Sequence, residues 1–194
     1  LFHGIGEKMA TSIVDKLGET ALEQIIENPS CLEIVPKLSY KKAKNIYDTL
    51  VKYEESHKTI VYLTELGFTM KDSLTIYNQY HERTISNIES NIYKLLQDIE
   101  GLSYQKIDSI ARNIGVNYDD ENRIKACILY CISDLIYKKG DTYVIFSEIK
   151  ESVEAYLNFE IEETDYYTYL DDLRWNSYIV LENDKYYLKN IWDA

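Results

Sequence analysis

The feature that most constrains the fold is a short turn followed at once by an amphipathic helix, first seen at residues 2–18. Gly4 and Gly6 flank a single apolar residue, and Gly18 stands where a helix C-cap is expected. Glycines beside a helix N-terminus leave backbone amides open to solvent, and these amides together with the helix dipole favour an anion. The helical period is carried by the apolar residues Met9, Ala10, Ile13, Val14 and Leu17.

The same outline recurs further along the chain, which indicates an internal repeat. Leu38-Ser39-Tyr40 and Leu102-Ser103-Tyr104 are identical triplets 64 residues apart, and each stands between a turn and a helical pattern. A more divergent copy enters its helix through Phe68-Thr69-Met70. The spacing of apolar residues predicts further helices over 19–27, 59–66, 71–80 and 83–91.

Lysines stand beside the turns, and the densest group lies at the start of the second copy. Lys37, Lys41, Lys42 and Lys44 surround Ser39, a suitable N-cap. Two interpretations stay open: a solvated helix face, or a site where Lys37 and Lys41 neutralise phosphates while turn amides hold them. Such contacts would be independent of base sequence and sensitive to salt. Comparable places in the other copies hold Lys8, Lys71, Lys106 and Arg112.

These copies resemble helix-hairpin-helix motifs. The first keeps both glycines, while the second has Lys37 and Ser39 in their places and the third has Gly101 and Ser103. Their order and spacing, with the Asn28-Pro29 linker and an acidic C-terminal part, resemble the non-catalytic region of RecD-like (RecD/TraA family) ATP-dependent DNA helicases. In that family, tandem helix-hairpin-helix units precede the motor domains. The resemblance implies that ATP and magnesium bind only in the parent's motor domains. Because the sequence starts almost on the first turn, we expect the helix before Phe2 to be either missing or supplied by upstream sequence.

Charge divides the chain into unequal parts. Residues 1–115 hold 16 acidic and 13 basic side chains, whereas residues 116–194 hold 17 acidic and 8 basic ones. The net charge of −12 by itself disfavours nucleic acid, but the first part is close to neutral with local basic spots. The 19 tyrosines suit base stacking, and a biased genome composition explains them as well.

From residue 116 the predicted order is helix, strand, helix, helix and β-hairpin, which is that of a winged helix. Asp120 is a suitable N-cap for the first helix, Tyr143-Val144-Ile145 is the expected strand, Ser147 the expected cap of the next helix, and 178–188 the hairpin. The would-be recognition helix over 162–175 is too acidic to face phosphates, so packing or partner docking is its expected role. Against Arg174 alone it carries Glu162, Glu163, Asp165, Asp171 and Asp172.

Catalytic and metal-binding patterns are absent from the sequence. It contains no Gly-x-x-x-x-Gly-Lys-(Ser/Thr) P-loop, and the histidines His3, His57 and His81 are scattered without a nucleophile partner. Cys127 and Cys131 lie one helical turn apart with no third ligand nearby, which favours a place in the core over a metal site. We therefore expect this fragment to be no enzyme and to hold no cofactor or metal. No apolar run is long enough to span a membrane.

The expected fold is mainly α, with tandem helix-hairpin-helix units over 1–115 followed by a small winged-helix-like α+β module over 116–194. The leading hypothesis is a non-catalytic DNA-handling region of a RecD-like helicase that organises the motor domains, in a cytoplasmic protein of DNA repair or recombination. The alternative is a protein-docking or scaffold region with no direct DNA contact.

Expected partners are DNA, bound weakly and without sequence specificity, the motor domains of the same polypeptide, and other replication or repair proteins, but no membrane. An odd number of cysteines without a regular framework favours a reducing compartment. The residues expected at the DNA backbone are Gly4, Gly6, Lys8, Lys37, Ser39, Lys41, Lys42, Gly101, Ser103 and Lys106.

Overall fold

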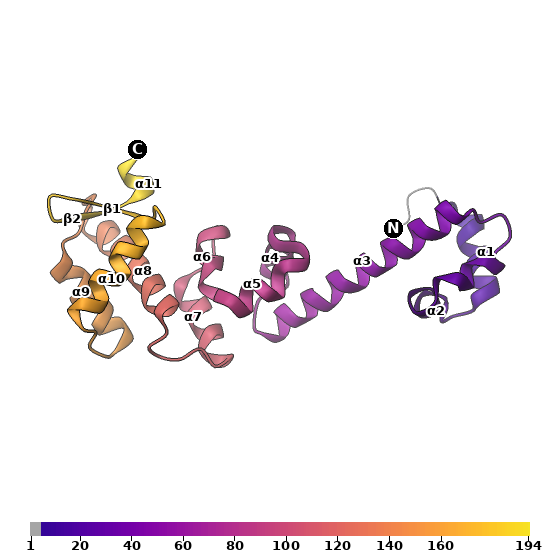
Figure 1. The fold of residues 1–194 in the computed structure, drawn as a ribbon, viewed down its shortest axis with the longest axis horizontal. Helices are drawn as coiled ribbons and strands as arrows, with labels where there is room; N and C mark the ends of the chain where they lie inside the picture. The colour runs from indigo at the N-terminus through magenta and orange to yellow at the C-terminus, as the bar shows by residue number, and fades with distance from the viewer. Residues whose placement is uncertain (1–4) are drawn as a thin grey trace. The chain divides into compact units, whose positions relative to one another are not determined.

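The computed structural model describes residues 5–194, which are mostly helical, as predicted (Figure 1). The chain divides into two compact units, the first ending at Glu82 and the second running from Arg83 to Ala194. The boundary expected after residue 115 falls inside the second unit, between helices α7 (Tyr104–Asn113) and α8 (Glu121–Lys139), which contact one another.

The first unit begins with helices α1 (Glu7–Leu17) and α2 (Ala21–Glu27), followed by the 3-10 helix η1 (Pro29–Ile34). Gly18 ends α1 with a positive φ, as its position in the sequence predicts. These elements close on the N-terminal part of α3 (Tyr40–Glu65) around one apolar cluster. Its buried members are Ile13, Leu17, Ala21, Ile25, Leu32, Val35, Ile46 and Leu50.

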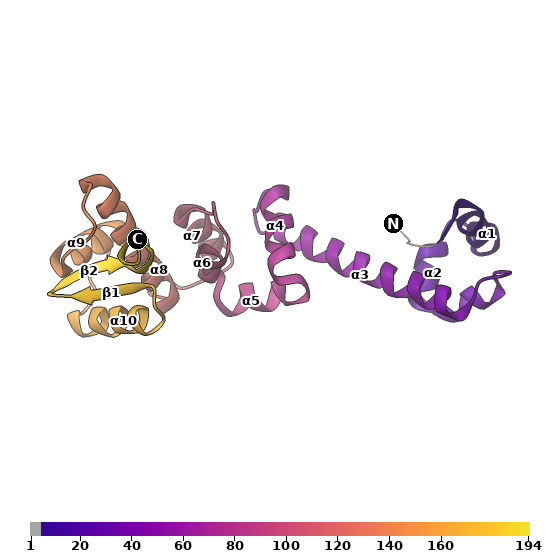
Figure 2. The same cartoon turned by 90° about the horizontal axis from the view of Figure 1, so that it is seen from above.

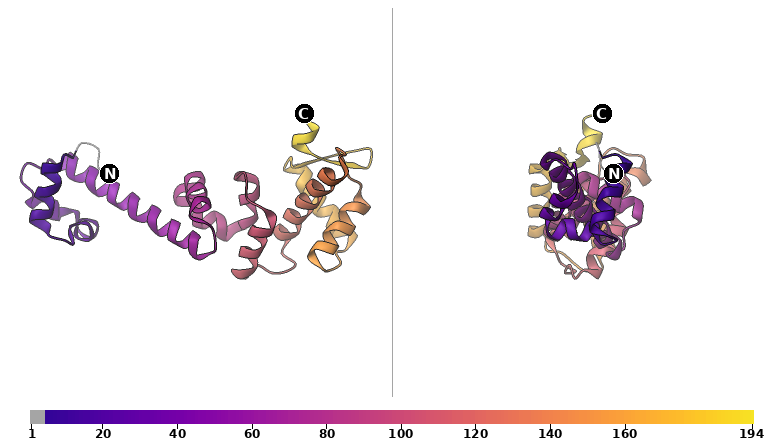
Figure 3. Two further views of the ribbon diagram at one scale, coloured as in Figure 1. Left: turned by 180° about the vertical axis from the view of Figure 1, so that it is seen from behind. Right: turned by 90° about the vertical axis from the view of Figure 1, so that its right-hand side faces the viewer.

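Helix α3 is one uninterrupted helix of 26 residues, rather than one helix after Ser39 and another over 59–66 (Figure 3). No Gly or Pro lies between Tyr40 and Glu65, so nothing in the backbone stops the helix between its two apolar segments. Its C-terminal part packs against α4 (Met70–Tyr80), where Leu63 and Ile76 are fully buried. The 3-10 turn η2 (His81–Arg83) follows α4.

The second unit opens with α5 (Thr84–Asn91), the 3-10 helix η3 (Ile92–Lys94) and the short α6 (Leu95–Asp98). Helix α7 packs on η3 and α6, and Gly115 ends it with a positive φ. Helix α8 then begins at the N-cap Asp120, whose carboxylate accepts from the Arg123 amide at 3.0 Å, and it ends at the left-handed Gly140. The N-cap at Asp120 agrees with the sequence prediction.

The rest of the second unit consists of α9 (Phe146–Leu157), α10 (Glu163–Trp175), strands β1 (Ile179–Glu182) and β2 (Lys185–Leu188), and α11 (Lys189–Trp192). The strands are antiparallel, with Val180 opposite Tyr187, and they lie beside α10 in Figure 2. The three helices and the hairpin predicted for this region are therefore present, and the small sheet stands near the C-terminus.

Two local predictions in this region are wrong. Tyr143-Val144-Ile145 does not form a strand, because Val144 alone bridges to Tyr186. Ser147 does not cap α9, since the helix starts at Phe146 and the Glu148 carboxylate accepts from the Ile145 amide at 3.1 Å. A carboxylate at the third helical position therefore satisfies the amide of the N-cap residue Ile145.

Replacing Gly101 by alanine should destabilise the second unit by about 1–2 kcal/mol. The φ of Gly101 is +88°, a conformation that side chains with a Cβ disfavour, although the added carbon would meet no neighbour within 4 Å. Both tryptophans, Trp175 and Trp192, lie in this unit, so urea unfolding followed by tryptophan fluorescence reports its stability. The matched control is Glu100→Ala, which trims an exposed side chain in the same turn and should change stability by less than about 0.5 kcal/mol. Equal costs for the two variants would contradict the backbone explanation.

Candidate nucleic-acid interface

The turns that enter the helices share one backbone conformation at their first position. Lys37, Gly67 and Gly101 have φ values of +63°, +105° and +88°. Each stands two residues before the N-cap of the next helix, so Lys37 occupies the place of a glycine in the same kind of turn. A non-glycine residue in this region of φ costs free energy, which the surrounding structure has to offset. Gly4, at the matching place in the first copy, lies outside the described residues.

The last position of each turn is an N-cap with extended backbone. Gly6, Ser39, Thr69 and Ser103 have φ between −91° and −68° and ψ between 146° and 165°. The hydroxyls of Ser39, Thr69 and Ser103 each accept from the amide three residues ahead, at 3.4, 3.1 and 3.3 Å. The divergent copy at Thr69 therefore has the same cap as the other two, although its sequence matches least well.

The middle position of each turn is apolar and fastens the turn to its unit. Ile5 and Leu38 pack against the same core cluster of the first unit, which brings the first two turns to one core. Phe68 is buried in its own turn, and Leu102 is half-buried in the second unit. Because this side chain is held inside, the residues on either side of it remain at the surface.

The predicted contact residues of the first unit lie at the surface. Gly6 caps α1, and Lys8 is exposed on its first turn. Lys37, Lys41 and Lys42 are exposed around the N-cap Ser39, and none of these lysines has an ion-pair partner within residues 5–194. In the same range, the amides of Tyr40 and Lys41 have no hydrogen-bond acceptor. Cations and open amides therefore meet at the start of α3.

The third predicted group lies in the second unit. Gly101 and Ser103 are exposed in the turn before α7, whereas Lys106 is half-buried on its first turn. The structure thus groups the predicted residues turn by turn: Gly6 with Lys8, Lys37 with Ser39, Lys41 and Lys42, and Gly101 with Ser103 and Lys106.

The family comparison covers the middle of the chain. Residues 52–143 match the family model of the HHH (helix-hairpin-helix) domain of the ATP-dependent RecD2 DNA helicase. Over residues 52–143 the chain is therefore similar to a RecD2-type HHH domain. The match includes the turns 67–69 and 101–103 and ends beyond α8, while the turns 4–6 and 37–39 precede it. The resemblance stated from the sequence is confirmed for this region, which is a DNA-handling region of a helicase family.

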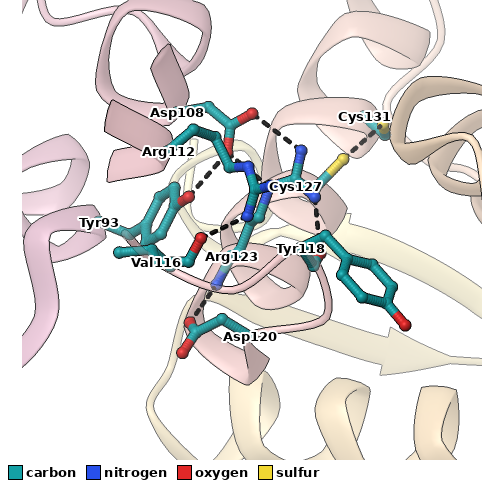
Figure 4. Close-up of polar contacts among 9 residues, drawn as sticks. All are labelled: Tyr93, Asp108, Arg112, Val116, Tyr118, Asp120, Arg123, Cys127 and Cys131. Carbon is teal, nitrogen blue, oxygen red and sulfur yellow. Dashed lines mark hydrogen bonds and ion pairs between the residues drawn. The ribbon is translucent and has the colours of Figure 1, made fainter. Parts of the chain in front are cut away.

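A buried polar cluster joins α7 to α8 inside the matched region (Figure 4). Arg123 forms a two-pronged ion pair with Asp108, its Nε and Nη2 lying 2.8 and 3.0 Å from the carboxylate oxygens. The Tyr93 hydroxyl donates to Asp108 at 2.7 Å, and the Tyr118 carbonyl accepts from Arg123 at 2.6 Å. Both charged side chains are nearly buried, so each depends on the other for its solvation.

The cluster fixes the charge state of its members. Burial opposes ionisation of Asp108, but the hydrogen bonds from Arg123 and Tyr93 outweigh it and hold the pKa of Asp108 below its ordinary 3.8. Burial and the hydrogen bond to Asp108 raise the pKa of Tyr93, which stays protonated and donates. The sequence analysis missed this cluster, because the residues are 15 positions apart and only the packing of α8 on α7 unites them.

Cys127 and Cys131 are buried on α8, with their sulfur atoms 3.9 Å apart. Their hydrogen bond and burial raise the pKa of the Cys127 thiol, which disfavours the thiolate. The place in the core that their spacing predicted is therefore observed. No cluster of three or more His, Cys, Asp or Glu residues suited to a metal ion occurs within residues 5–194. No helix in the described part of the chain has the length and hydropathy of a bilayer span.

Ion pairs within the second unit neutralise part of the negative charge of helix α10. Asp172 pairs with Lys125 of α8 at 2.6 Å, and Asp171 pairs with Arg174 at 2.8 Å. Glu162 and Asp165 remain exposed. The predicted acidic surface is thus partly an anchor to α8.

Asp108→Asn should destabilise the second unit by about 3 kcal/mol at pH 7, because Arg123 would stay buried without its counter-charge. The matched control is Asp134→Asn, which removes the exposed ion pair with Lys138 on α8 and should cost less than about 1 kcal/mol.

The effect of Asp108→Asn should also depend on pH. A carboxylate whose pKa is lowered by folding contributes its full stabilisation above its unfolded pKa and loses it as the pH falls through the folded value. The difference in unfolding free energy between wild type and Asp108→Asn should therefore shrink below pH 3.8. Urea titrations followed by tryptophan fluorescence at several pH values measure it. A difference that stays constant down to pH 2 would refute the charged role of Asp108.

Proposed function

We propose that this chain is the DNA-handling, non-catalytic region of a RecD2-type helicase and holds the DNA backbone through its hairpin turns. The contacts are made by Gly6 and Lys8, by Lys37, Ser39, Lys41 and Lys42, and by Gly101, Ser103 and Lys106. The observation that carries the proposal is the meeting of unpaired lysines with open amides at the start of α3. Both groups favour a phosphate, and neither reads a base.

The charge distribution predicts how strong this contact is. The net charge of −12 repels DNA at long range, so the isolated chain binds weakly and only at low salt. The local cations beside the hairpin turns supply the attraction, while the acidic helix α10 stays away from the phosphates. In the parent protein, the motor domains bind ATP and magnesium, and this region guides the strand toward them in a reducing compartment such as the cytoplasm.

Replacing Lys41 and Lys42 by glutamate should weaken DNA binding at least about ten-fold and lower the salt slope of log K by about 2. Two phosphate contacts are lost, and two negative charges are placed beside the open amides. Fluorescence anisotropy with labelled single-stranded and forked DNA, from low salt upward, measures both quantities.

The matched control is Lys52→Glu with Lys58→Glu, which changes two exposed lysines further along α3 by the same total charge. If the proposal holds, the control variant lowers the affinity for DNA only through its added negative charge, and it leaves the salt slope close to that of the wild type. Wild-type binding that is absent at low salt, or an equal loss in both variants, would remove the direct contact at the α3 turn.

A further inference from the structure

The conformational repeat extends well beyond the turns. Asn28 and Asn91 both cap a 3-10 helix, and their side chains accept from the Ser30 and Tyr93 amides at 3.2 and 3.0 Å. Their backbones agree as well, with φ and ψ of −146° and 92° at Asn28 and −163° and 95° at Asn91. We define the first repeat as residues 21–48 and the second repeat as residues 84–112. Equivalent buried positions include Ile25 and Ile88, Leu32 and Leu95, and Ile46 and Ile110.

In the second repeat, one face is covered by α8. Tyr104 stacks on Tyr130 of α8 with ring centroids 5.3 Å apart, and the Tyr130 hydroxyl accepts from Gln105 at 2.7 Å. Asp108, one turn further along α7, pairs with Arg123 of α8. The covering helix therefore presents an aromatic side chain and a charged side chain to this face, and Tyr104 is only 3% exposed.

In the first repeat, the equivalent face is open. Tyr40, which corresponds to Tyr104, is 84% exposed. Beside it lies a groove of about 650 Å³ on the first unit alone. Its apolar lining is Pro29, Leu32, Leu38, Tyr40, Ala43 and Tyr47, and its other lining residues are Ser30, Glu33, Lys44 and Asp48. Most of these positions correspond to residues that the second repeat buries under or beside α8.

Two carboxylates, Glu33 and Asp48, line the groove, but the position that faces Arg123 in the second repeat carries the opposite charge here. Lys44 lines the groove at the position that corresponds to Asp108, and it has no ion-pair partner within residues 5–194. A helix that covers this face as α8 covers the second repeat would therefore place a carboxylate, not an arginine, against residue 44. The α8 of a second copy is a poor occupant, because its Arg123 would meet Lys44.

We propose that the open face of the first repeat binds an amphipathic helix of a partner protein, which carries aliphatic or aromatic side chains toward Tyr40 and a carboxylate toward Lys44. The duplicated fold supplies the geometry of the complex, because α8 on the second repeat shows how a helix lies on this surface. Partner docking here goes beyond DNA contact, and its test contains no DNA.

The test uses the full chain and labelled peptides of residues 121–139 in fluorescence polarisation. The probe carries Arg123→Glu, and the control peptide keeps Arg123. We expect the probe to bind the wild-type chain about ten-fold more tightly than the control peptide does, and Lys44→Asp to reverse this preference. Tyr40→Ala should lower the affinity for the probe peptide at least about five-fold, since it removes the stacking surface. Both substitutions are at exposed positions, so the fold should tolerate them.

The results of this experiment distinguish a partner helix that carries a carboxylate from α8 of a second copy and from no helix at all. A reversal of preference at residue 44, together with the loss at Tyr40→Ala, supports docking on this face. No binding of the probe up to about 1 mM, or affinities that do not respond to residue 44, would overturn the proposal. Tighter binding of the control peptide to the wild-type chain would also overturn it and assign the face to α8 of a second copy.

Discussion

The structure depends on a constraint of the backbone at the hairpin turns. A residue with positive φ, an apolar side chain held in the interior and an extended N-cap follow one another, and together they reverse the chain and start a helix. This order decides what lies outside: the first-turn amides, the cap and the side chains of the first turn. Lys37 adopts φ +63° where Gly67 and Gly101 stand in other copies, so the shape of the turn is kept even where the residue that best suits it is absent. A phosphate site made of amides needs this shape more than it needs glycine.

The second constraint is the way in which α8 packs on α7. Asp108 and Arg123 are nearly buried, and either one alone would be an unsolvated charge. Their pair, hydrogen-bonded by Tyr93, ties α8 to α7 at one register, since a shift by one turn would separate the two charges. In the second repeat, α8 therefore covers the face around Tyr104 and connects the repeat to the elements that follow α8. The first repeat has no such helix in the described structure, and its equivalent face stays open.

The sequence allowed most helices, the caps at Ser39 and Asp120, and the repeat of the turns to be predicted, because apolar periodicity and capping are local properties. It also pointed to the helicase family. It did not reveal the cap at Thr69, since Gly67-Phe68-Thr69 shares too few letters with the other turns, nor the continuity of α3. The Asp108–Arg123 cluster and the contrast between Tyr104 and Tyr40 were beyond reach for a different reason. The triplets Leu-Ser-Tyr are identical, and their different burial comes from distant neighbours that only one of them has: rings of η3, α8 and α9 pack on Tyr104.

The helical period explains how one short segment can serve two purposes. Tyr40, Ala43, Lys44 and Tyr47 recur at intervals of three and four residues and line the groove, so they lie on one face of α3. Lys41 and Lys42 do not line it, and they stand with Lys37 beside the open amides. A polyanion at the turn and a helix in the groove would then use different side chains of the same helix start. Since Lys44 lies one turn beyond Lys41, a carboxylate paired with Lys44 in the groove would neutralise part of the local positive charge and weaken the binding of a nearby phosphate. The two contacts would therefore be coupled through charge without sharing a residue.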